Sequence, residues 1–385
     1  ILDGGVFVNS GQVLTIEQGT TIKGKSGQGE EASAFIVARG AKINAVGTAS
    51  EPIIFTSESD NGSNLPATAR GLWGGVIILG NATLNSATGE TAIEGIPTSE
   101  TRGLYGGNND NDNSGTLKYV SIRHGGTDIG AGNEINGLTL GGVGSGTIIE
   151  YIEIVANNDD GIEFFGGTVN TKYLISAFCG DDAIDYDEGY RGKNQFAFVL
   201  QDPSKGDRGG EHDGGTDPED GNPYATPTFY NATFMGRGES AGTRAITFRD
   251  NAGGKYVNSI FMNYGKGVDV EDLASGEDSK ARLDAGDLQY RDNIHWNIAS
   301  NDPAQQVLSS TGDDLLTHPN VTGNQVVDPL FIGAIPSASG PAGTATGMTG
   351  DNHIENVSYK GAFDPVAAQP WYTGWTYTDE KGLIN

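Results

Sequence analysis

The chain has 385 residues, of which 60 are glycine and 14 are proline, and 23 Lys plus Arg face 50 Asp plus Glu, for a formal net charge of −27 at pH 7. Glycine at this level without a Gly-X-Y period excludes collagen and favours turn-rich β structure, while the aromatic and β-branched residues exclude a disordered chain. The acidic balance argues against nucleic acid as a partner, because phosphates need a basic surface, and favours bound cations and an extracellular location.

Short runs of β-branched and aromatic residues open the chain, and Gly, Asn and Ser separate them. Such runs predict β-strands, here at residues 6–8, 14–16, 21–23, 35–37 and 53–55. Four segments are too long for tight turns and predict loops that leave the strands and can wall a groove. These loops span residues 60–70, 86–112, 202–227 and 275–286.

A repeated pattern occupies the middle of the chain. Residues 158–164 (NDDGIEF) correspond to residues 180–186 (GDDAIDY), with an offset of 22 residues at every position. A period in the twenties with alternating apolar residues predicts a solenoid whose coils stack. Looser copies follow at residues 210–213, 246–249 and 268–271.

Alternation along a strand predicts the face that each residue occupies. Ile162 and Ile184 are expected to point into the solenoid, so Glu163 and Asp185 point out. Coils about 4.8 Å apart would stack the outward side chains into an acidic wall. Its expected members are Asp159, Asp160, Glu163, Asp181, Asp182, Asp185, Asp187, Glu188, Glu211, Asp213, Asp269 and Glu271, with Arg191, Arg208, Arg244 and Arg249 nearby.

The segments 13–20, 38–43, 71–76 and 150–154, together with the repeated Asp-Asp-Gly-Ile coils, resemble secreted or surface bacterial right-handed parallel β-helix proteins. The resemblance covers residues 1–300 and implies an all-β, pectate-lyase-like right-handed parallel β-helix of about a dozen coils. Proteins of this kind usually lack an assigned activity. Residues 301–385 are expected to form an irregular extension packed on the helix, and its aromatic residues are expected to cap the open end of the solenoid, with sugar binding as the alternative. They are Trp371, Tyr372, Trp375 and Tyr377.

Three interpretations of the acidic wall follow from the mutual repulsion of its carboxylates, which must be neutralised. The first is Ca²⁺, which prefers oxygen ligands; the expected ligands are Asp159, Asp160, Asp181, Asp182, Asp185 and Asp187. The second is catalysis on a glycosidic bond, for which the candidates are Glu163, Asp185, Asp187, Glu211, His212, Asp213 and Arg249. The third is a solvated face that the arginines balance.

Motifs for catalysis are incomplete. Gly-Asp-Asp at residues 180–182 is similar to that of polygalacturonase-type glycosidases, which share the fold, but the chain contains neither Gly-His-Gly nor Arg-Ile-Lys. Polysaccharide lyases of this fold need a Lys or Arg base near Ca²⁺. Lys193 or Arg249 could supply such a base, although no lyase motif surrounds either residue.

A second calcium candidate contains Asp110 and Asp112. The pattern Asp110-x-Asp112-x-Ser114-Gly copies the first half of a calcium loop, but Ser121 stands where the bidentate Glu is expected. A run of Asp and Asn also forms ordinary turns, so both interpretations stay open. His212 is expected to point inward in a structural role, unless the 202–227 loop breaks the register and makes it an acid/base candidate.

The sequence therefore predicts a secreted or cell-surface, calcium-stabilised protein. Its expected role is structural or adhesive, or it binds acidic or neutral polysaccharide or other cell-surface components. Self-assembly into a homo-oligomer or filament is a further hypothesis, because the ends of a parallel β-helix expose unpaired backbone groups. The alternative is a glycoside hydrolase or polysaccharide lyase that uses Glu163, Asp185 and Glu211. No transmembrane run of about 20 apolar residues is present.

Overall fold

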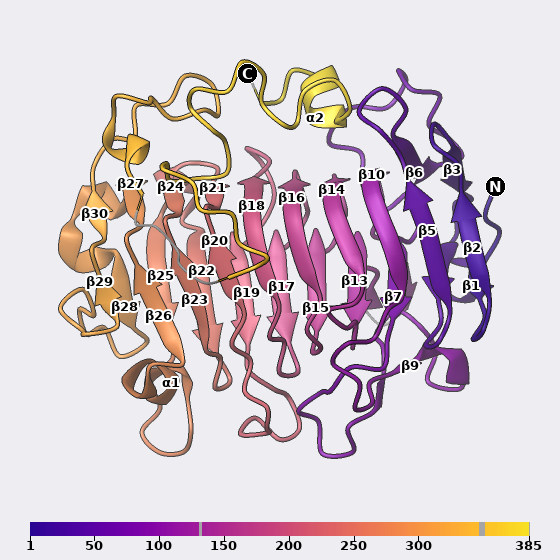
Figure 1. Ribbon diagram of the computed structural model, residues 1–385, viewed down its shortest axis with the longest axis horizontal. Helices are drawn as coiled ribbons and strands as arrows, with labels where there is room; N and C mark the ends of the chain where they lie inside the picture. The colour runs from indigo at the N-terminus through magenta and orange to yellow at the C-terminus, as the bar shows by residue number, and fades with distance from the viewer. Residues whose placement is uncertain (131–132, 346–350, 385) are drawn as a thin grey trace.

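The computed structural model describes residues 1–130, 133–345 and 351–384 and shows a right-handed parallel β-helix with its coils stacked along the longest axis (Figure 1). One face is a parallel ten-stranded sheet, so the described chain makes ten coils on this face rather than about a dozen. Its strands, in spatial order, are β1 (Gly5–Val8), β4 (Ala34–Val37), β7 (Val76–Leu79), β13 (Leu138–Gly141), β15 (Ile162–Phe165), β17 (Ile184–Asp187), β19 (Gly210–Asp213), β22 (Arg244–Arg249), β25 (Lys266–Val270) and β28 (Val307–Ser309).

Sixteen further strands form one sheet, which folds along a corner, while two small two-stranded sheets lie in the insertions. The first strip contains β2 (Val13–Ile16), β5 (Lys42–Val46), β10 (Gly115–Arg123), β14 (Ile148–Val155), β16 (Asn170–Ala177), β18 (Lys193–Leu200), β20 (Thr228–Tyr230), β23 (Gly254–Val257), β26 (Leu288–Arg291) and β29 (Val321–Thr322). The short strands of a second strip, beyond the corner, are β3 (Thr21–Gly24), β6 (Ile53–Ser57), β21 (Thr233–Met235), β24 (Ile260–Tyr264), β27 (Ile294–Ile298) and β30 (Gln325–Val326). The ends of the long strands continue into this strip, where β10 pairs with β6 and β18 with β21. Each predicted N-terminal strand lies inside one of these elements.

Residues in the left-handed backbone conformation form the corner in the long strands. Tyr119, Tyr151 and Tyr173 have φ of 52, 56 and 59°, a conformation that non-glycine residues seldom adopt. Their rings stack from coil to coil with centroids 4.3 Å apart. Because the rings pack face to face, the ladder stabilises the same bend in each successive coil.

The predicted repeat is confirmed by strand pairing. Ile162 pairs with Ile184 and Glu163 with Asp185, which is the 22-residue offset. Ile162 and Ile184 are fully buried in the core, as the alternation predicts. Gly161, just before β15, lies so close to the next coil that a Cβ there would be 2.0 Å from the Ser176 Oγ. Glycine in these turns therefore permits the coils to approach closely.

Insertions between the coils carry the remaining elements. The loop of residues 81–112, called here the covering loop, folds back over the outer face of the ten-stranded sheet. The elements of the insertions are η1 (Gly29–Glu31), β8 (Thr91–Ala92), η2 (Thr101–Gly103), β9 (Leu104–Tyr105), β11 (Asp128–Gly130), β12 (Asn133–Glu134), η3 (Glu239–Ala241), α1 (Ser279–Ala285), η4 (Ala299–Asn301) and η5 (Pro303–Gln305). No helix in the described ranges is long and apolar enough to cross a membrane.

The C-terminal segment lies along the flank of the β-helix, with η6 (Pro341–Gly343) and α2 (Tyr377–Glu380), and α2 sits beside the end of β10 (Figure 1). Trp375 packs edge-on against Tyr119 with centroids 5.5 Å apart. The buried Glu153 accepts hydrogen bonds from the backbone N–H groups of Tyr377 and Thr378. The prediction of an end cap is therefore wrong, because the tyrosine ladder and Glu153 hold this segment on the flank. Strand pairing also continues past residue 300, through β30.

Candidate functional site

Eight strands of the ten-stranded sheet each place one outward-pointing residue in a common column, which strand pairing aligns. In spatial order, from β4 to β25, the column contains Ile36, Ile77, Thr139, Glu163, Asp185, Glu211, Thr247 and Asp269. The outer face therefore changes from apolar to acidic along the axis, and the acidic wall begins at Glu163.

The acidic part of this face is covered rather than solvated. Glu163 is 8% exposed and Asp185 and Asp187 are each 9% exposed. Phe165, which also points outward, packs with Tyr105 of the covering loop at a centroid distance of 6.1 Å. The interpretation of the wall as a plain solvated face is therefore wrong for these coils, because the covering loop excludes water from them.

Three carboxylates meet under this cover. Each of Asp160, Glu163 and Asp185 offers an oxygen that lies within 4.8 Å of the other two, and all three residues are buried. We call these residues the unpaired cluster, because no lysine or arginine in the described ranges forms an ion pair with any of them. Two residues from neighbouring segments complete its surroundings: the Asn136 amide donates both to Glu163 and to Glu94 of the covering loop.

Two buried oxygens at this place have no hydrogen-bond partner among the described residues, namely the Asp185 Oδ1 and the Asn136 Oδ1. A buried polar atom without a partner costs about 1–3 kcal/mol, and more when it is charged. The donors available to the cluster are few, since the Asp160 Oδ1 accepts one hydrogen bond, from the Asp182 N–H at 2.8 Å. The cluster thus has more acceptor oxygens than donors, which is the composition of a cation site.

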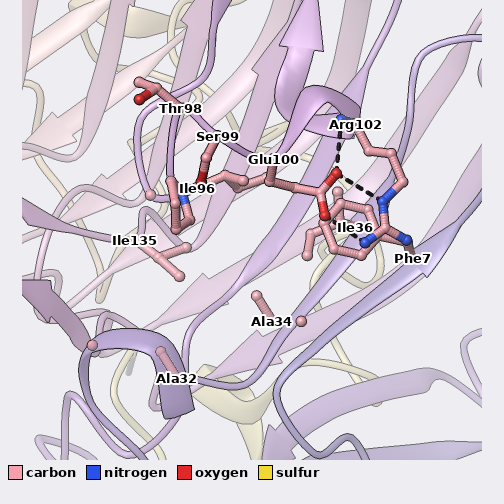
Figure 2. Close-up of a pocket in the computed structure, with 14 residues that line it drawn as sticks. Phe7, Ala32, Ala34, Ile36, Ile96, Thr98, Ser99, Glu100, Arg102 and Ile135 are labelled. Atoms are coloured by element: carbon pink, nitrogen blue, oxygen red, sulfur yellow. Dashed lines mark hydrogen bonds and ion pairs between the residues drawn. The ribbon is translucent and has the colours of Figure 1, made fainter.

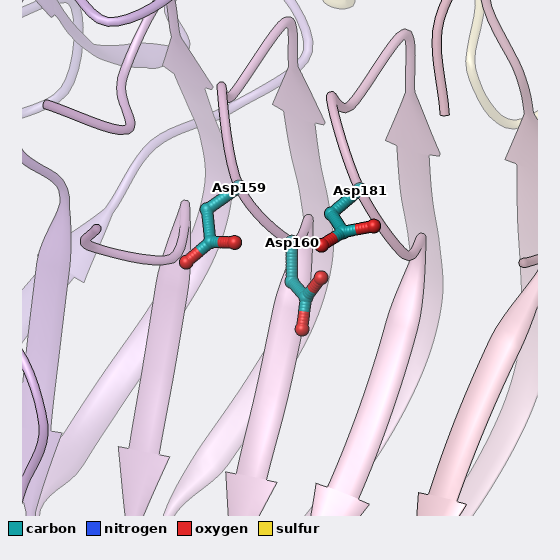
Figure 3. Close-up of side chains that lie close together, drawn as sticks. All are labelled: Asp159, Asp160 and Asp181. Carbon is teal, nitrogen blue, oxygen red and sulfur yellow. The ribbon is translucent and has the colours of Figure 1, made fainter. Parts of the chain in front are cut away.

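Further carboxylates extend the cluster along the turns that precede the strands. Figure 3 shows Asp159, Asp160 and Asp181 on the turns that lead into β15 and β17, and their oxygens also lie within 4.8 Å of one another. A third such group contains Asp181, Asp182 and Asp207. Asp207 was not among the predicted residues, although it continues the Asp159–Asp181 ladder with a spacing of 26 residues, the same as from Asp185 to Glu211.

Burial and mutual repulsion shift the protonation of these groups. Burial raises the pKa of Asp159 to about 7, and the nearby Glu94 adds to the effect. Burial, followed by the charge of Asp185, raises the pKa of Glu163 well above its ordinary value. The pKa of Asp185 rises for the same reasons, with Asp160 as its main charged neighbour. A cation at the cluster would offset both causes, because it favours the ionised carboxylates.

The next coils hold carboxylates of a different kind. One Glu211 oxygen lies 2.7 Å from Nη1 of Arg249 and 2.9 Å from Nη1 of Arg208. Arg249 also donates to both oxygens of Asp213, at 2.6 and 3.0 Å. This bonding raises the pKa of the Arg249 guanidinium, chiefly through Asp213. We call Arg208, Glu211, Asp213 and Arg249 the paired cluster; its acids already have counter-charges from the protein.

Other predicted site residues lie apart from the unpaired cluster. Asp187 accepts a hydrogen bond from the Thr216 Oγ1 at 2.6 Å. Asp110 accepts from the Thr83 N–H and pairs with Arg191 at 3.1 Å, while Asp112 accepts from the Asn81 amide at 3.1 Å. In the described structure Asp110 and Asp112 thus fasten the covering loop. Calcium at these two residues stays a prediction.

His212 points into the core, as the alternation predicts. Its ring stacks on Tyr186 at 4.1 Å and its Nε2 is 2.7 Å from the Tyr256 hydroxyl. Burial lowers the pKa of His212 to about 3, so the imidazole is neutral at ordinary pH. The 202–227 loop leaves the register of β19 intact, which removes the condition under which His212 would become an acid/base group.

Residues 1–328 match the family model of the pectate-lyase-like β-helix domain. The chain belongs to this family. The match covers every strand of the β-helix and ends two residues after β30. No curated protein and no solved structure matches the chain, so family membership assigns the fold of this domain and leaves its activity to be argued from the site.

For glycoside hydrolysis, this pectate-lyase-like domain would need two carboxyls with opposite protonation states, which unequal surroundings create. Glu163 and Asp185 do not differ in this way, because burial and like charge raise the pKa of both. Glu211 and Asp213 are ion-paired with Arg249. The arrangement therefore favours cation binding over acid/base catalysis.

A cleft of about 770 Å³ opens on the apolar end of the same outer face, between the first strands and the covering loop (Figure 2). The Arg102 guanidinium lies 3.8 Å from the centroid of the Phe7 ring and donates to Glu100. The cleft is lined by Gly5, Phe7, Gly29, Ala32, Ala34, Ile36, Gly95, Ile96, Pro97, Thr98, Ser99, Glu100, Arg102 and Ile135. An apolar floor with a few polar groups at its rim is typical of a ligand site.

Proposed function

We propose that this β-helix domain is a calcium-dependent binding protein that works outside the cell, without catalysis, and that Ca²⁺ at the unpaired cluster stabilises the fold. The observation that carries the proposal is the burial of Asp160, Glu163 and Asp185 within 4.8 Å of one another without a cationic side chain. Burying a charge without a partner costs several kcal/mol. A cation that takes six to eight oxygens would remove that cost.

The chemistry of the donors supports calcium as the cation. All candidate ligands are carboxylate oxygens, and hard cations prefer such sets to the nitrogen and sulfur ligands of zinc. Extracellular calcium modules bind with dissociation constants of about 10⁻⁴–10⁻³ M. The net charge of −27 and the many extracellular members of the family support the same location.

Acidic or neutral polysaccharide, or another component of the cell surface, is the partner that this proposal assigns. A calcium ion on an acidic face can bridge to the carboxylates of an acidic glycan, while the cleft offers the apolar floor and polar rim that suit sugar rings. Through such contacts the domain would serve an adhesive or structural role. A homo-oligomer or filament would multiply weak contacts of this kind.

Calorimetric titration of calcium into metal-free protein tests the proposal. We expect wild type to bind Ca²⁺, Asp185→Asn to bind it at least about tenfold more weakly, and Asp269→Asn, in the same column but paired with Arg244 at 3.0 Å, to bind it normally. Wild type should also retain pectate, alginate or a neutral glycan in a calcium-dependent pull-down, without releasing reducing ends or unsaturated products. Absence of calcium binding, or turnover of a glycan, would overturn the proposal.

A further inference from the structure

The covering loop reaches the unpaired cluster through one residue, Glu94. Its carboxylate accepts a hydrogen bond from the Asn136 amide at 2.9 Å, and the same amide donates to Glu163. Glu94 also lies within hydrogen-bond reach of the Glu163 carboxyl. Two acids from separate segments therefore face each other under the loop, and when both are ionised their repulsion pushes the loop outward.

A second observation shows that a ligand position is still open at this contact. The Asp185 Oδ1 is buried and has no hydrogen-bond partner among the described residues. The Asn136 side chain, 1% exposed, presents its Nδ2 to Glu94 and Glu163. Through these contacts Glu94 places a carboxylate of the covering loop beside the three of the unpaired cluster, so the oxygens come from both the β-helix and its cover.

The same segments line the cleft. Gly95 and Ile96 follow Glu94 directly, and Ile135 precedes Asn136; all three line the cleft. Ile96 and Ile135 also pack in one apolar cluster with Ile36 and Ile77 of the outer face. Any movement of Glu94 is therefore transmitted, through one peptide unit, to the wall of the cleft.

We propose that one divalent cation is shared between the unpaired cluster and Glu94, and that it latches the covering loop and so fixes the shape of the cleft. This inference rests on the proposed function, since it requires a cation at the cluster, and it adds that cation binding controls the ligand site beside it. A ligand of the cleft would then bind more tightly to calcium-loaded protein. Reciprocally, it would raise the affinity for calcium, as linkage requires.

Amide hydrogen exchange of the full chain, with Ca²⁺ and with chelator, tests the latch. In wild type we expect calcium to slow exchange of residues 93–104 by about 5- to 150-fold, the usual range of coupling between sites. The loop of residues 275–286, which carries α1 at the other end of the β-helix (Figure 1), should not respond. Glu94→Gln should still bind calcium through the three cluster residues, but most of the protection at residues 93–104 should disappear.

Glu90→Gln is the matched control, because Glu90 lies in the same loop and pairs with Arg39 away from the cluster. It should retain full protection. If calcium does not bind wild type at all, the proposed function fails and the latch fails with it. If calcium binds but residues 93–104 exchange equally with and without it, or Glu94→Gln keeps the protection, the latch alone is wrong. The wild-type comparison decides this even where a variant folds poorly.

Discussion

The unpaired and paired clusters lie on neighbouring coils and differ chiefly in the source of positive charge. Asp185 and Glu211 are neighbours in the strand pairing of β17 and β19. Glu211 forms ion pairs with two guanidinium groups within 3.0 Å, whereas no lysine or arginine in the described ranges forms an ion pair with Asp185. The same backbone position can thus be neutralised permanently by arginine or reversibly by a cation, and only the second arrangement responds to the composition of the solution.

The largest expected effect breaks the scaffold that both clusters share. Ile184→Asp would place an unpaired charge at a fully buried position of the inward column, which costs several kcal/mol. We expect no folded protein by circular dichroism and urea titration. Thr15→Asp is the control, because Thr15 is exposed on β2. Near-normal stability of Ile184→Asp would mean that the inward and outward assignments are reversed for both clusters.

The next effect removes one of the two arginines of the paired cluster. Arg249→Met leaves Asp213 without its guanidinium partner and Glu211 with Arg208 alone. A buried pair broken on one side costs about 3–5 kcal/mol; since the Arg249 side chain is 39% exposed, we expect about 2 kcal/mol in urea titrations with chelator. Calcium should recover part of the loss, giving this coil the dependence that we propose for its neighbour.

Lys25→Met is the control for Arg249→Met, because the Lys25–Asp3 pair is exposed on both sides and such pairs contribute about 0–1 kcal/mol. An Arg249→Met protein as stable as wild type in chelator would show that solvent screens the paired cluster. The ion pairs of the paired cluster would then contribute nothing measurable to the free energy of unfolding, and the two clusters would differ only in geometry.

Much of this comparison could be predicted from the sequence, because a β-helix repeats locally. The 22-residue offset predicted the pairing of Glu163 with Asp185, and alternation predicted that His212 points inward. Asp207 was missed although its 26-residue spacing from Asp181 equals that from Asp185 to Glu211, because the third copy of the repeat was assigned only over residues 210–213.

The cover over the wall could not be predicted, since it depends on contacts between distant segments that follow no period. Glu94 lies 69 positions before Glu163 and in a loop without a repeat. The contact of Glu153 with Tyr377 spans 224 positions, which is why the C-terminal segment was assigned to the end of the β-helix and not to its flank. Local alternation along a strand determines which way a side chain points, but contacts with distant segments determine whether an outward side chain is exposed to solvent.

The pH dependence of stability is a smaller effect to which both clusters contribute, because burial also raises the pKa of Asp213, in the paired cluster, to about 7. A carboxyl whose folded pKa is raised above its unfolded value binds more protons in the folded state, so stability falls as pH rises between the two values. For Asp159 this window runs from the ordinary 3.8 to about 7, and Glu163 and Asp185 shift in the same direction. In chelator, the melting temperature should therefore decline across this range.

Calcium should reduce that decline, because it replaces the protons at the unpaired cluster but not at Asp213 of the paired cluster. The measurement is a series of melting curves from pH 4.5 to 8 in chelator and in excess calcium. Parallel curves, with the same slope in both solutions, would show that the cation and the protons do not compete for the same oxygens. The unpaired cluster would then lose its distinguishing property.

The smallest expected effect is that two conservative substitutions in the same column change the free energy of unfolding in opposite directions in chelator. Glu163→Gln removes one of the like charges of the unpaired cluster but keeps the shape of the side chain. In chelator at pH 8 it should stabilise the protein by up to about 1 kcal/mol, because it relieves repulsion that is offset by no counter-charge. Asp269→Asn instead removes the partner of Arg244, at 3.0 Å on a partly exposed surface, and should cost about 0.5 kcal/mol. In calcium, Glu163→Gln should instead lower the free energy of unfolding, since the substitution then removes a ligand.

Urea titrations of both variants in chelator and in calcium measure all four free-energy changes. If Glu163→Gln destabilises the protein in chelator, the hydrogen bonds that Glu163 shares with Glu94 and Asn136 outweigh the repulsion.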